Sequence, residues 1–270
     1  MPGGVEDALV ARLRAAGCVF AEDEAAILLE SAGDDAGALD AMCARREAGE
    51  PLEHVVGWVR FGGLRLGVGP GVFVPRQRTR ALAREAVREA RSRPGAVVVE
   101  ACCGVGPVAA TVLRTEPGAR VHACDVDARA LAYAAANLGS AGAVHLGRGL
   151  RALPAGLRGT VDVVAAVPPY VPTGSRGLMP REAREHEPQE ALFAGPDGLD
   201  VVRALVAEAP AWLRAGGVLV VEMHPDQARA VAAAADRQVW AGAGLVGRDP
   251  HTGVLRLVRS DAGQAQAGPA

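Results

Sequence analysis

One stretch decides the fold class: Ala96-Val-Val-Val-Glu100-Ala-Cys-Cys-Gly104-Val-Gly106. Its apolar run predicts a buried strand over 96–100, and its glycines allow a tight turn into a helix expected over 105–114. In an open parallel sheet, ligands bind at the carboxyl ends of the strands. The N-terminus of the helix after the turn favours an anionic group such as a carboxylate.

Downstream of this stretch, the hydrophobic pattern alternates between strands and helices. Strands are expected over 120–124, 144–146, 161–167, 217–222, 239–241 and 254–258, and helices over 128–138, 199–213 and 226–235. A long loop is expected from the end of the 161–167 strand to Pro196. This alternation predicts an α/β domain with a mostly parallel sheet and helices on both faces.

Upstream, residues 5–49 have apolar residues at helical spacing in three segments, which predicts a small helical bundle. A β-hairpin is expected over 58–68, turning at Gly62-Gly63, and a helix over 77–91. These patterns predict four regions. They are an N-terminal helical domain over 1–54, a β-hairpin linker over 55–75, an α/β domain over 76–259, and a Gly/Ala/Gln-rich disordered tail over 260–270.

The composition narrows the classes of function. The 270 residues carry a formal charge of −2, and all 29 basic residues are Arg, a bias typical of a GC-rich genome. This charge argues against direct binding of nucleic acid through bulk electrostatics. Five cysteines without regular spacing predict reduced thiols, and no signal peptide or membrane span is expected. The sequence therefore predicts a cytoplasmic protein.

Two acidic residues are candidates for cofactor binding. Asp125 ends the second strand about 20 residues after the glycine turn, where an acid suits hydrogen bonds to ribose hydroxyls. It could instead cap the following helix together with Asp127. Glu100 ends the first strand, and its alternative interpretation is a surface acid. The G-x-G turn alone resembles dinucleotide sites, but a third glycine is missing at Ala109.

The strongest signal for catalysis follows the strand expected over 161–167. It reads Pro168-Pro169-Tyr170, a rigid turn whose carbonyls can accept hydrogen bonds from an amine or amide NH₂. The tyrosine ring can flank a planar substrate. The alternative interpretation is a simple rigid loop.

Several motifs resemble those of the release factor glutamine methyltransferases, the HemK-like family. The similarity runs from about residue 9 to residue 223. The motifs that carry it are Glu50-Pro-Leu-Glu-His54, Pro70-Gly-Val-Phe-Val-Pro-Arg76, Pro168-Pro-Tyr-Val-Pro172, His186-Glu-Pro188 and Ala191-Leu-Phe-Ala-Gly-Pro-Asp-Gly-Leu-Asp200. The Cys102-Cys103 pair and Val171-Pro172-Thr173 resemble an actinobacterial branch whose substrate is unsettled.

The resemblance implies a Rossmann-like class I methyltransferase fold that uses S-adenosylmethionine (SAM), with a small N-terminal helical domain that helps to recognise a protein substrate. It implies methyl transfer to a glutamine side-chain amide, of a peptide chain release factor or a similar protein, without a metal. The implied catalytic residues are Val167, Pro168, Pro169 and Tyr170. The implied cofactor-binding residues are Glu100, Cys102, Gly104, Gly106, Asp125, Val126 and Arg148, and the implied substrate-binding residues are Pro75, Arg76, Glu187 and Pro188.

Four residues depart from the pattern of this family. Val167 replaces the Asn of Asn-Pro-Pro-Tyr, and Arg148 replaces an acid that lies near adenine. Cys102 replaces the first glycine of the turn, and Arg80 replaces an acid. Two alternatives therefore stay open, a methyltransferase for another protein or small-molecule acceptor and a catalytically impaired binding protein. An enzyme that methylates nucleic acid is disfavoured because no target-recognition domain or broad basic surface is visible.

Other residues have simpler interpretations. The arginines Arg76, Arg80, Arg84 and Arg88 recur every four residues, which could bind an acidic partner but better suits a solvated helix face. The histidines have no metal-ligand spacing. Cys102 and Cys103 are interpreted as small residues that fill the tight turn, not as nucleophiles.

Overall fold

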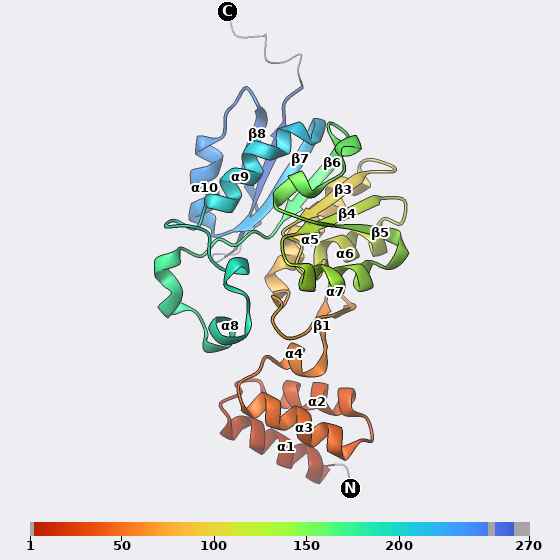
Figure 1. The fold of residues 1–270 in the computed structure, drawn as a ribbon, viewed down its shortest axis with the longest axis vertical. Coiled ribbons are helices and arrows are strands. Elements are labelled where there is room, and N and C mark those ends of the chain that lie inside the picture. Colours follow the sequence, from red (N-terminus) through yellow and green to blue (C-terminus); the bar gives the residue numbers. More distant parts are fainter. Residues whose placement is uncertain (1–2, 248–251, 262–270) are drawn as a thin grey trace, which may run out of the picture.

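The computed structural model describes residues 3–247 and 252–261. Four helices form the N-terminal bundle: α1 Gly3–Ala15, α2 Ala21–Ala32, α3 Ala36–Glu47 and α4 Leu52–Val56. The bundle lies apart from the larger α/β domain, and α4 and a hairpin connect the two (Figure 1). It has a core of its own, which includes Leu9, Leu13, Leu28, Cys43 and Val55.

The expected hairpin is present as β1 Trp58–Phe61 and β2 Leu64–Gly67, paired antiparallel. The side chain of Asn137 fixes it to the α/β domain. Its amide oxygen accepts from Gly67 N at 2.7 Å, and its NH₂ donates to Gly67 O at 3.1 Å and to Val105 O at 2.9 Å. The hairpin is therefore bonded directly to the domain that carries the candidate site.

Seven strands form the central sheet in the order β5-β4-β3-β6-β7-β9-β8. Their bounds are β3 Val97–Ala101, β4 Arg120–Asp125, β5 Gly142–Leu146, β6 Val161–Ala166, β7 Leu213–Met223, β8 Trp240–Val246 and β9 Gly253–Arg259. The first five are parallel, and β9 pairs antiparallel with both β7 and β8. The chain winds outward from β3 to β5 and then returns to β6 beside β3, so the strand order reverses there. This is where an open α/β sheet binds its ligands.

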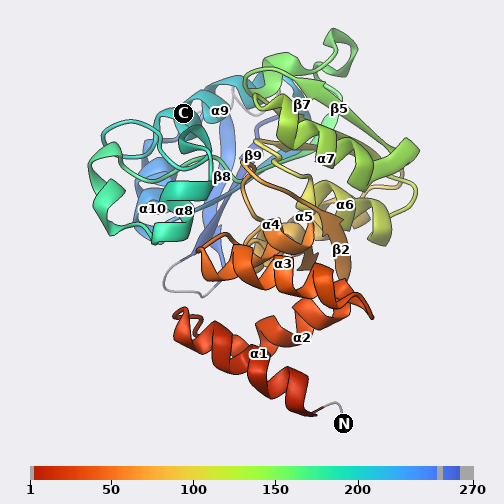
Figure 2. The same ribbon diagram turned by 60° about the horizontal axis from the view of Figure 1, so that its bottom comes forward.

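Helices cover both faces of the sheet (Figures 1 and 2). One apolar core packs under α5 Arg80–Arg91, α6 Pro107–Thr115 and α7 Ala128–Leu138. A second core packs under α9 Asp200–Glu208 and α10 Pro225–Ala234. The predicted α/β class is confirmed.

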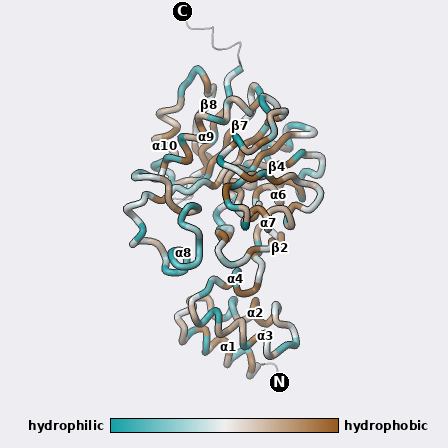
Figure 3. The backbone as a smooth tube through the Cα atoms, viewed as in Figure 1, coloured by the Kyte–Doolittle hydropathy of each residue, from teal (hydrophilic) through white to brown (hydrophobic). Residues whose placement is uncertain are grey.

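Several features differ from the sequence-based expectation. The strands expected over 217–222 and 239–241 are longer, as β7 Leu213–Met223 and β8 Trp240–Val246. The helix expected over 199–213 ends at Glu208, because Pro210 cannot continue an α-helix, and Leu213 already begins β7. The segment expected to be a long loop contains α8 Arg181–His186. This helix is markedly hydrophilic (Figure 3) and too short to show a hydrophobic period. The tail expected to be disordered lies outside the described residues from 262 onward.

Seven short 3₁₀ helices complete the described elements. They are η1 Gln77–Thr79, η2 Gly139–Ala141, η3 Gly149–Ala152, η4 Ala155–Leu157, η5 Thr173–Leu178, η6 Gln189–Ala191 and η7 Ala209–Ala211. Within residues 3–247 and 252–261, no helix has the length and apolar character needed to cross a membrane.

Because the bundle has a separate core, we expect it to unfold separately. Leu28→Ala removes a fully buried side chain and should lower the free energy of unfolding of the bundle by about 2–5 kcal/mol. In a Trp58→Phe background, the fluorescence of Trp212 and Trp240 reports only on the α/β domain. In urea denaturation of Leu28→Ala in this background, the circular-dichroism transition of the bundle should occur at a lower urea concentration. The midpoint of the fluorescence transition, which reports on the α/β domain, should not change. Val19→Ala, at an 84% exposed position, is the control, and a common shift of both midpoints would contradict separate unfolding.

Candidate active site

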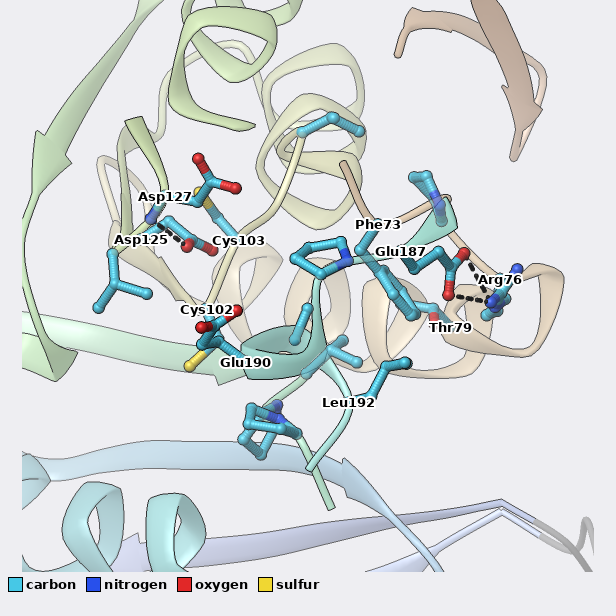
Figure 4. A pocket seen from close by; sticks show the side chains of 18 of the residues that line it. Phe73, Arg76, Thr79, Cys102, Cys103, Asp125, Asp127, Glu187, Glu190 and Leu192 are labelled. Atoms are coloured by element: carbon cyan, nitrogen blue, oxygen red, sulfur yellow. Dashed lines mark hydrogen bonds and ion pairs between the residues drawn. The ribbon is translucent and has the colours of Figure 1, made fainter. Parts of the chain in front are cut away.

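A cavity of about 940 Å³ opens at the carboxyl ends of the central strands. Its volume is in the range of pockets that hold a cofactor and a substrate group together. The side chains at its two ends come from distant parts of the chain (Figure 4). All of the predicted site residues line it except Gly104 and Gly106, namely Glu100, Cys102, Asp125, Val126, Arg148, Val167, Pro168, Pro169, Tyr170, Pro75, Arg76, Glu187 and Pro188.

Gly104 and Gly106 shape the turn that follows β3. This turn borders the part of the cavity lined by Glu100, Cys102, Asp125 and Val126, which we call the cofactor half. Both glycines have left-handed backbone, with φ of 52° and 79°. Cys102 also has positive φ, 52°, and it is the one non-glycine residue of the described chain that does. A side chain is strained in this conformation, by roughly 1–2 kcal/mol. Burial raises the pKa of the Cys102 and Cys103 thiols, which keeps them protonated and poorly nucleophilic.

Glu100 lies beneath this turn with 1% of its surface exposed. Its two carboxylate oxygens accept from the backbone N–H of Val108, at 3.2 Å, and of Ala109, at 2.6 Å. Glu100 thus satisfies the N-terminus of α6 and is not the surface acid of the alternative interpretation. Burial raises its pKa to about 8, although the two backbone N–H groups act in the opposite direction.

Asp125 joins the turn to the end of β4. One carboxylate oxygen accepts from Gly104 N at 2.8 Å and the other from Asp127 N at 2.9 Å. Asp127, not Asp125, caps α7 by accepting from Arg129 N at 2.8 Å. The capping alternative for Asp125 is therefore wrong. Burial raises the pKa of Asp125, and the backbone N–H groups that it accepts from lower it.

The cofactor half fits SAM, the group that the family resemblance implies. Each oxygen of Asp125 accepts one hydrogen bond from the protein, which leaves acceptor capacity for two ribose hydroxyls. A Cβ atom on Gly104 would meet no atom within 4 Å, so the space above the turn is open for the methionine moiety. Val126 is 52% exposed and offers an apolar surface for adenine, while Arg148 is exposed at the edge of the cavity.

The Pro168-Pro169-Tyr170 turn also lines the cavity. We call the part of the cavity around this turn, Arg76 and Glu187 the acceptor half. Pro168 and Pro169 have no backbone N–H, so the turn offers carbonyl oxygens. Gln227 fixes the end of the turn, since its NH₂ donates to Tyr170 O at 3.0 Å and to Asp197 O at 2.9 Å. A Cβ atom on Gly198 would lie 2.1 Å from Tyr170 O, so only glycine fits there.

Arg76 and Glu187, predicted to bind substrate, bind each other. Arg76 Nη2 lies 2.7 and 2.6 Å from the two carboxylate oxygens of Glu187, and Val74 N donates to the same carboxylate at 3.3 Å (Figure 4). The pair joins the segment after the hairpin to the α8 segment and forms one wall of the acceptor half. Arg46, in α3, reaches the α8 segment at Glu182, 2.7 Å away, so the bundle also supports this wall.

Sequence reasoning missed three residues around the turn. Arg78 donates to the Tyr170 hydroxyl at 3.0 Å and lies 3.4 Å from the buried carboxylate of Glu222. Gln227 holds the Tyr170 carbonyl. Sequence separations of 57 to 144 residues hide these contacts from any local pattern, and only the position of Arg78 beside Arg76 offered a signal.

Comparisons with known proteins point to methyltransferases. Residues 70–175 match the family described as methyltransferase small domain. A release factor glutamine methyltransferase of Mycolicibacterium smegmatis is 40% identical over 83% of this chain and 81% of its own. A release factor glutamine methyltransferase of Streptomyces coelicolor is 42% identical over 68% of this chain and 66% of its own.

A relative that is named for a different activity is also similar. The 4-amino-L-phenylalanine/4-methylamino-L-phenylalanine methyltransferase of Streptomyces pristinaespiralis is 41% identical over 66% of this chain and 62% of its own. The matched part thus spans slightly less than two thirds of both Streptomyces relatives.

Among solved structures, a methyltransferase of Pyrococcus furiosus has the same fold. Its TM-score is 0.53 at 17% identity, over 74% of this chain and 91% of its own.

The raised pKa of Glu100 predicts a pH-dependent stability. A carboxyl whose pKa rises from its unfolded value of 4.5 to about 8 contributes most below pH 4.5, and this contribution falls as the pH rises through 8. Glu100→Gln, which cannot ionise, removes the effect. Between pH 5 and pH 8.5, the stability of the wild type relative to Glu100→Gln should fall by more than about 1 kcal/mol in urea denaturation. A pH-independent difference would show that Glu100 folds already ionised.

The positive φ of Cys102 predicts that glycine is better tolerated there. Cys102→Gly should raise the free energy of unfolding by up to about 1 kcal/mol and should not weaken SAM binding in calorimetric titration, because it relieves strain and enlarges the cavity. Cys102→Ala retains the Cβ atom and is the matched control. Equal stability of the two variants would mean that the backbone at this position is not strained.

Proposed function

Because the chain belongs to the release factor glutamine methyltransferase family, we propose that it transfers a methyl group from SAM to the side-chain amide nitrogen of a glutamine in a peptide chain release factor. One observation carries the proposal. The Pro168-Pro169-Tyr170 turn lies in the same cavity as Asp125, so a cofactor and a planar amide can meet there. When bound, SAM supplies the methyl group as an electrophile.

The chain would contribute binding and orientation. An amide nitrogen is a poor nucleophile because its lone pair is delocalised, so its alignment with the methyl group decides the rate. Holding two reactants in line can supply much of the barrier reduction. Carbonyl oxygens of the turn would accept from the amide NH₂, and the Tyr170 ring would flank the amide plane.

The remaining residues would enclose the reaction. Asp125 would hold the ribose hydroxyls, and Val126 would cover one face of the adenine. The wall built by Arg76 and Glu187 would exclude water from the acceptor half, which strengthens polar interactions there. The helical bundle, bonded to this wall through Arg46, would contact the protein that carries the glutamine.

Val167 favours a second candidate acceptor. The family has an Asn at this position, and valine makes the pocket more apolar. The similar Streptomyces pristinaespiralis protein is named for methylation of an aryl amine on an amino acid. A small aromatic amine is therefore the alternative acceptor for this chain. Such a nitrogen needs less activation, because it carries no neighbouring carbonyl.

Labelling with methyl-labelled SAM tests the proposal. We expect transfer to a release factor, and no transfer to a variant of that factor whose target glutamine is replaced. Val167→Asn restores one oriented polar contact, so it should raise the rate by about fivefold or more. Val167→Leu has a similar shape without the amide and should not raise the rate.

The same assay separates the alternatives. Labelling of 4-amino-L-phenylalanine but not of the release factor would assign the aryl-amine activity. Loss of that labelling in Val167→Asn would support the same conclusion. A chain that binds SAM in calorimetric titration but labels neither acceptor would overturn the proposal.

A further inference from the structure

Arg78 joins the catalytic turn to a buried carboxylate. Its Nη2 lies 3.0 Å from the hydroxyl oxygen of Tyr170, and its Nε lies 3.4 Å from Oε1 of Glu222. Arg78 belongs to η1, Tyr170 follows β6, and Glu222 lies in β7 with 1% of its surface exposed. All three line the cavity, so the contact lies where the acceptor must enter.

The chemistry of arginine fixes the direction of this hydrogen bond. A guanidinium only donates, so the Tyr170 oxygen must accept, and its own O–H is left to donate elsewhere. A phenol that accepts from a cation is polarised, which makes its O–H a stronger donor. Gln227 donates to the backbone carbonyl of Tyr170, and Arg78 donates to its hydroxyl oxygen. Hydrogen bonds therefore hold both the backbone and the tip of the side chain of Tyr170.

The turn itself offers no side-chain donor other than the Tyr170 hydroxyl, and Arg76 and Glu187 in the cavity wall are paired with each other. The Val167 side chain carries no polar atom, Pro168 and Pro169 have no N–H, and Phe73 and Leu192 are apolar. We propose that Arg78 is a positioning residue that holds the Tyr170 hydroxyl as the hydrogen-bond donor to an oxygen of the methyl acceptor. The inference rests on the proposed function in one respect, that the acceptor binds at this turn.

The contact also has a structural part. The Arg78 side chain is 46% exposed but that of Glu222 is 1% exposed, so removal of Arg78 takes a cation away from a buried carboxylate and lowers stability. Burial raises the pKa of Tyr170, and the charge of Arg78 lowers it. The charged groups that act on the phenol are Arg78, Glu222 and Arg76. Removal of Arg78 should therefore be visible in the titration of Tyr170.

The chain has only two tyrosines, Tyr133 and Tyr170, which makes a clean spectroscopic test possible. In a Tyr133→Phe background, ¹³C-labelled tyrosine gives one ring-carbon signal, from Tyr170. Arg78→Met should raise the phenol pKa measured by NMR by about one pH unit, whereas Arg78→Lys should largely restore it. Arg80→Met removes the same charge two residues away, where the side chain bonds Gln77 O, and should leave the titration nearly unchanged.

Kinetics with an acceptor that the wild type methylates completes the test. Tyr170→Phe and Arg78→Met should each lower kcat/KM about tenfold, and the double variant should lower it no further, because both remove one interaction. Additive losses, or equal titrations for Arg78→Met and Arg80→Met, would overturn the inference. If the wild type methylates neither candidate acceptor, the proposed function fails, and the Tyr170 titration alone decides whether Arg78 holds the hydroxyl.

Discussion

The candidate site depends on one buried carboxyl group, that of Glu100. It ends the central strand of the parallel sheet and accepts from two backbone N–H groups at the N-terminus of α6. These two bonds set the direction in which the chain leaves β3, and therefore the path of the turn over 102–106. Asp125 holds the same turn from the neighbouring strand through Gly104. The cofactor half is thus built mainly from local contacts between adjacent elements.

The acceptor half is built in the opposite way, from contacts between distant segments. The bond between Arg76 and Glu187 spans 111 residues, and Arg46 reaches Glu182 from another domain. Both glutamates belong to the α8 segment, so ion pairs hold this segment to the helical bundle and to the segment after the hairpin. The fold therefore separates a cofactor half built from neighbouring elements from an acceptor half built from distant segments.

This separation explains what could be predicted from the sequence. The hydrophobic period located the helix over 128–138 to the residue and most strands within about two residues, because apolar periodicity reports local structure directly. The placement of Asp125 beside the glycine turn was predicted correctly, because one strand and one helix fix its position relative to that turn. Helix α8 and the contact of Arg78 with Tyr170 were not found, since neither has a local pattern. The mutual pairing of Arg76 and Glu187 was also missed, because each side chain looked free in sequence.

The polar groups of the acceptor half also bear on the choice of acceptor. With Val167 in place of an amide, this position offers no polar atom, and the donors beside the turn are the Tyr170 hydroxyl and the Arg78 guanidinium. A donor that bonds the nitrogen itself occupies the lone pair that attacks the methyl group, so a useful donor acts through a neighbouring oxygen. A glutamine amide has such an oxygen on the same carbon as its nitrogen, whereas an aryl amine has none nearby. The apolar Val167 favours the aryl amine, whereas the donor beside it favours the amide.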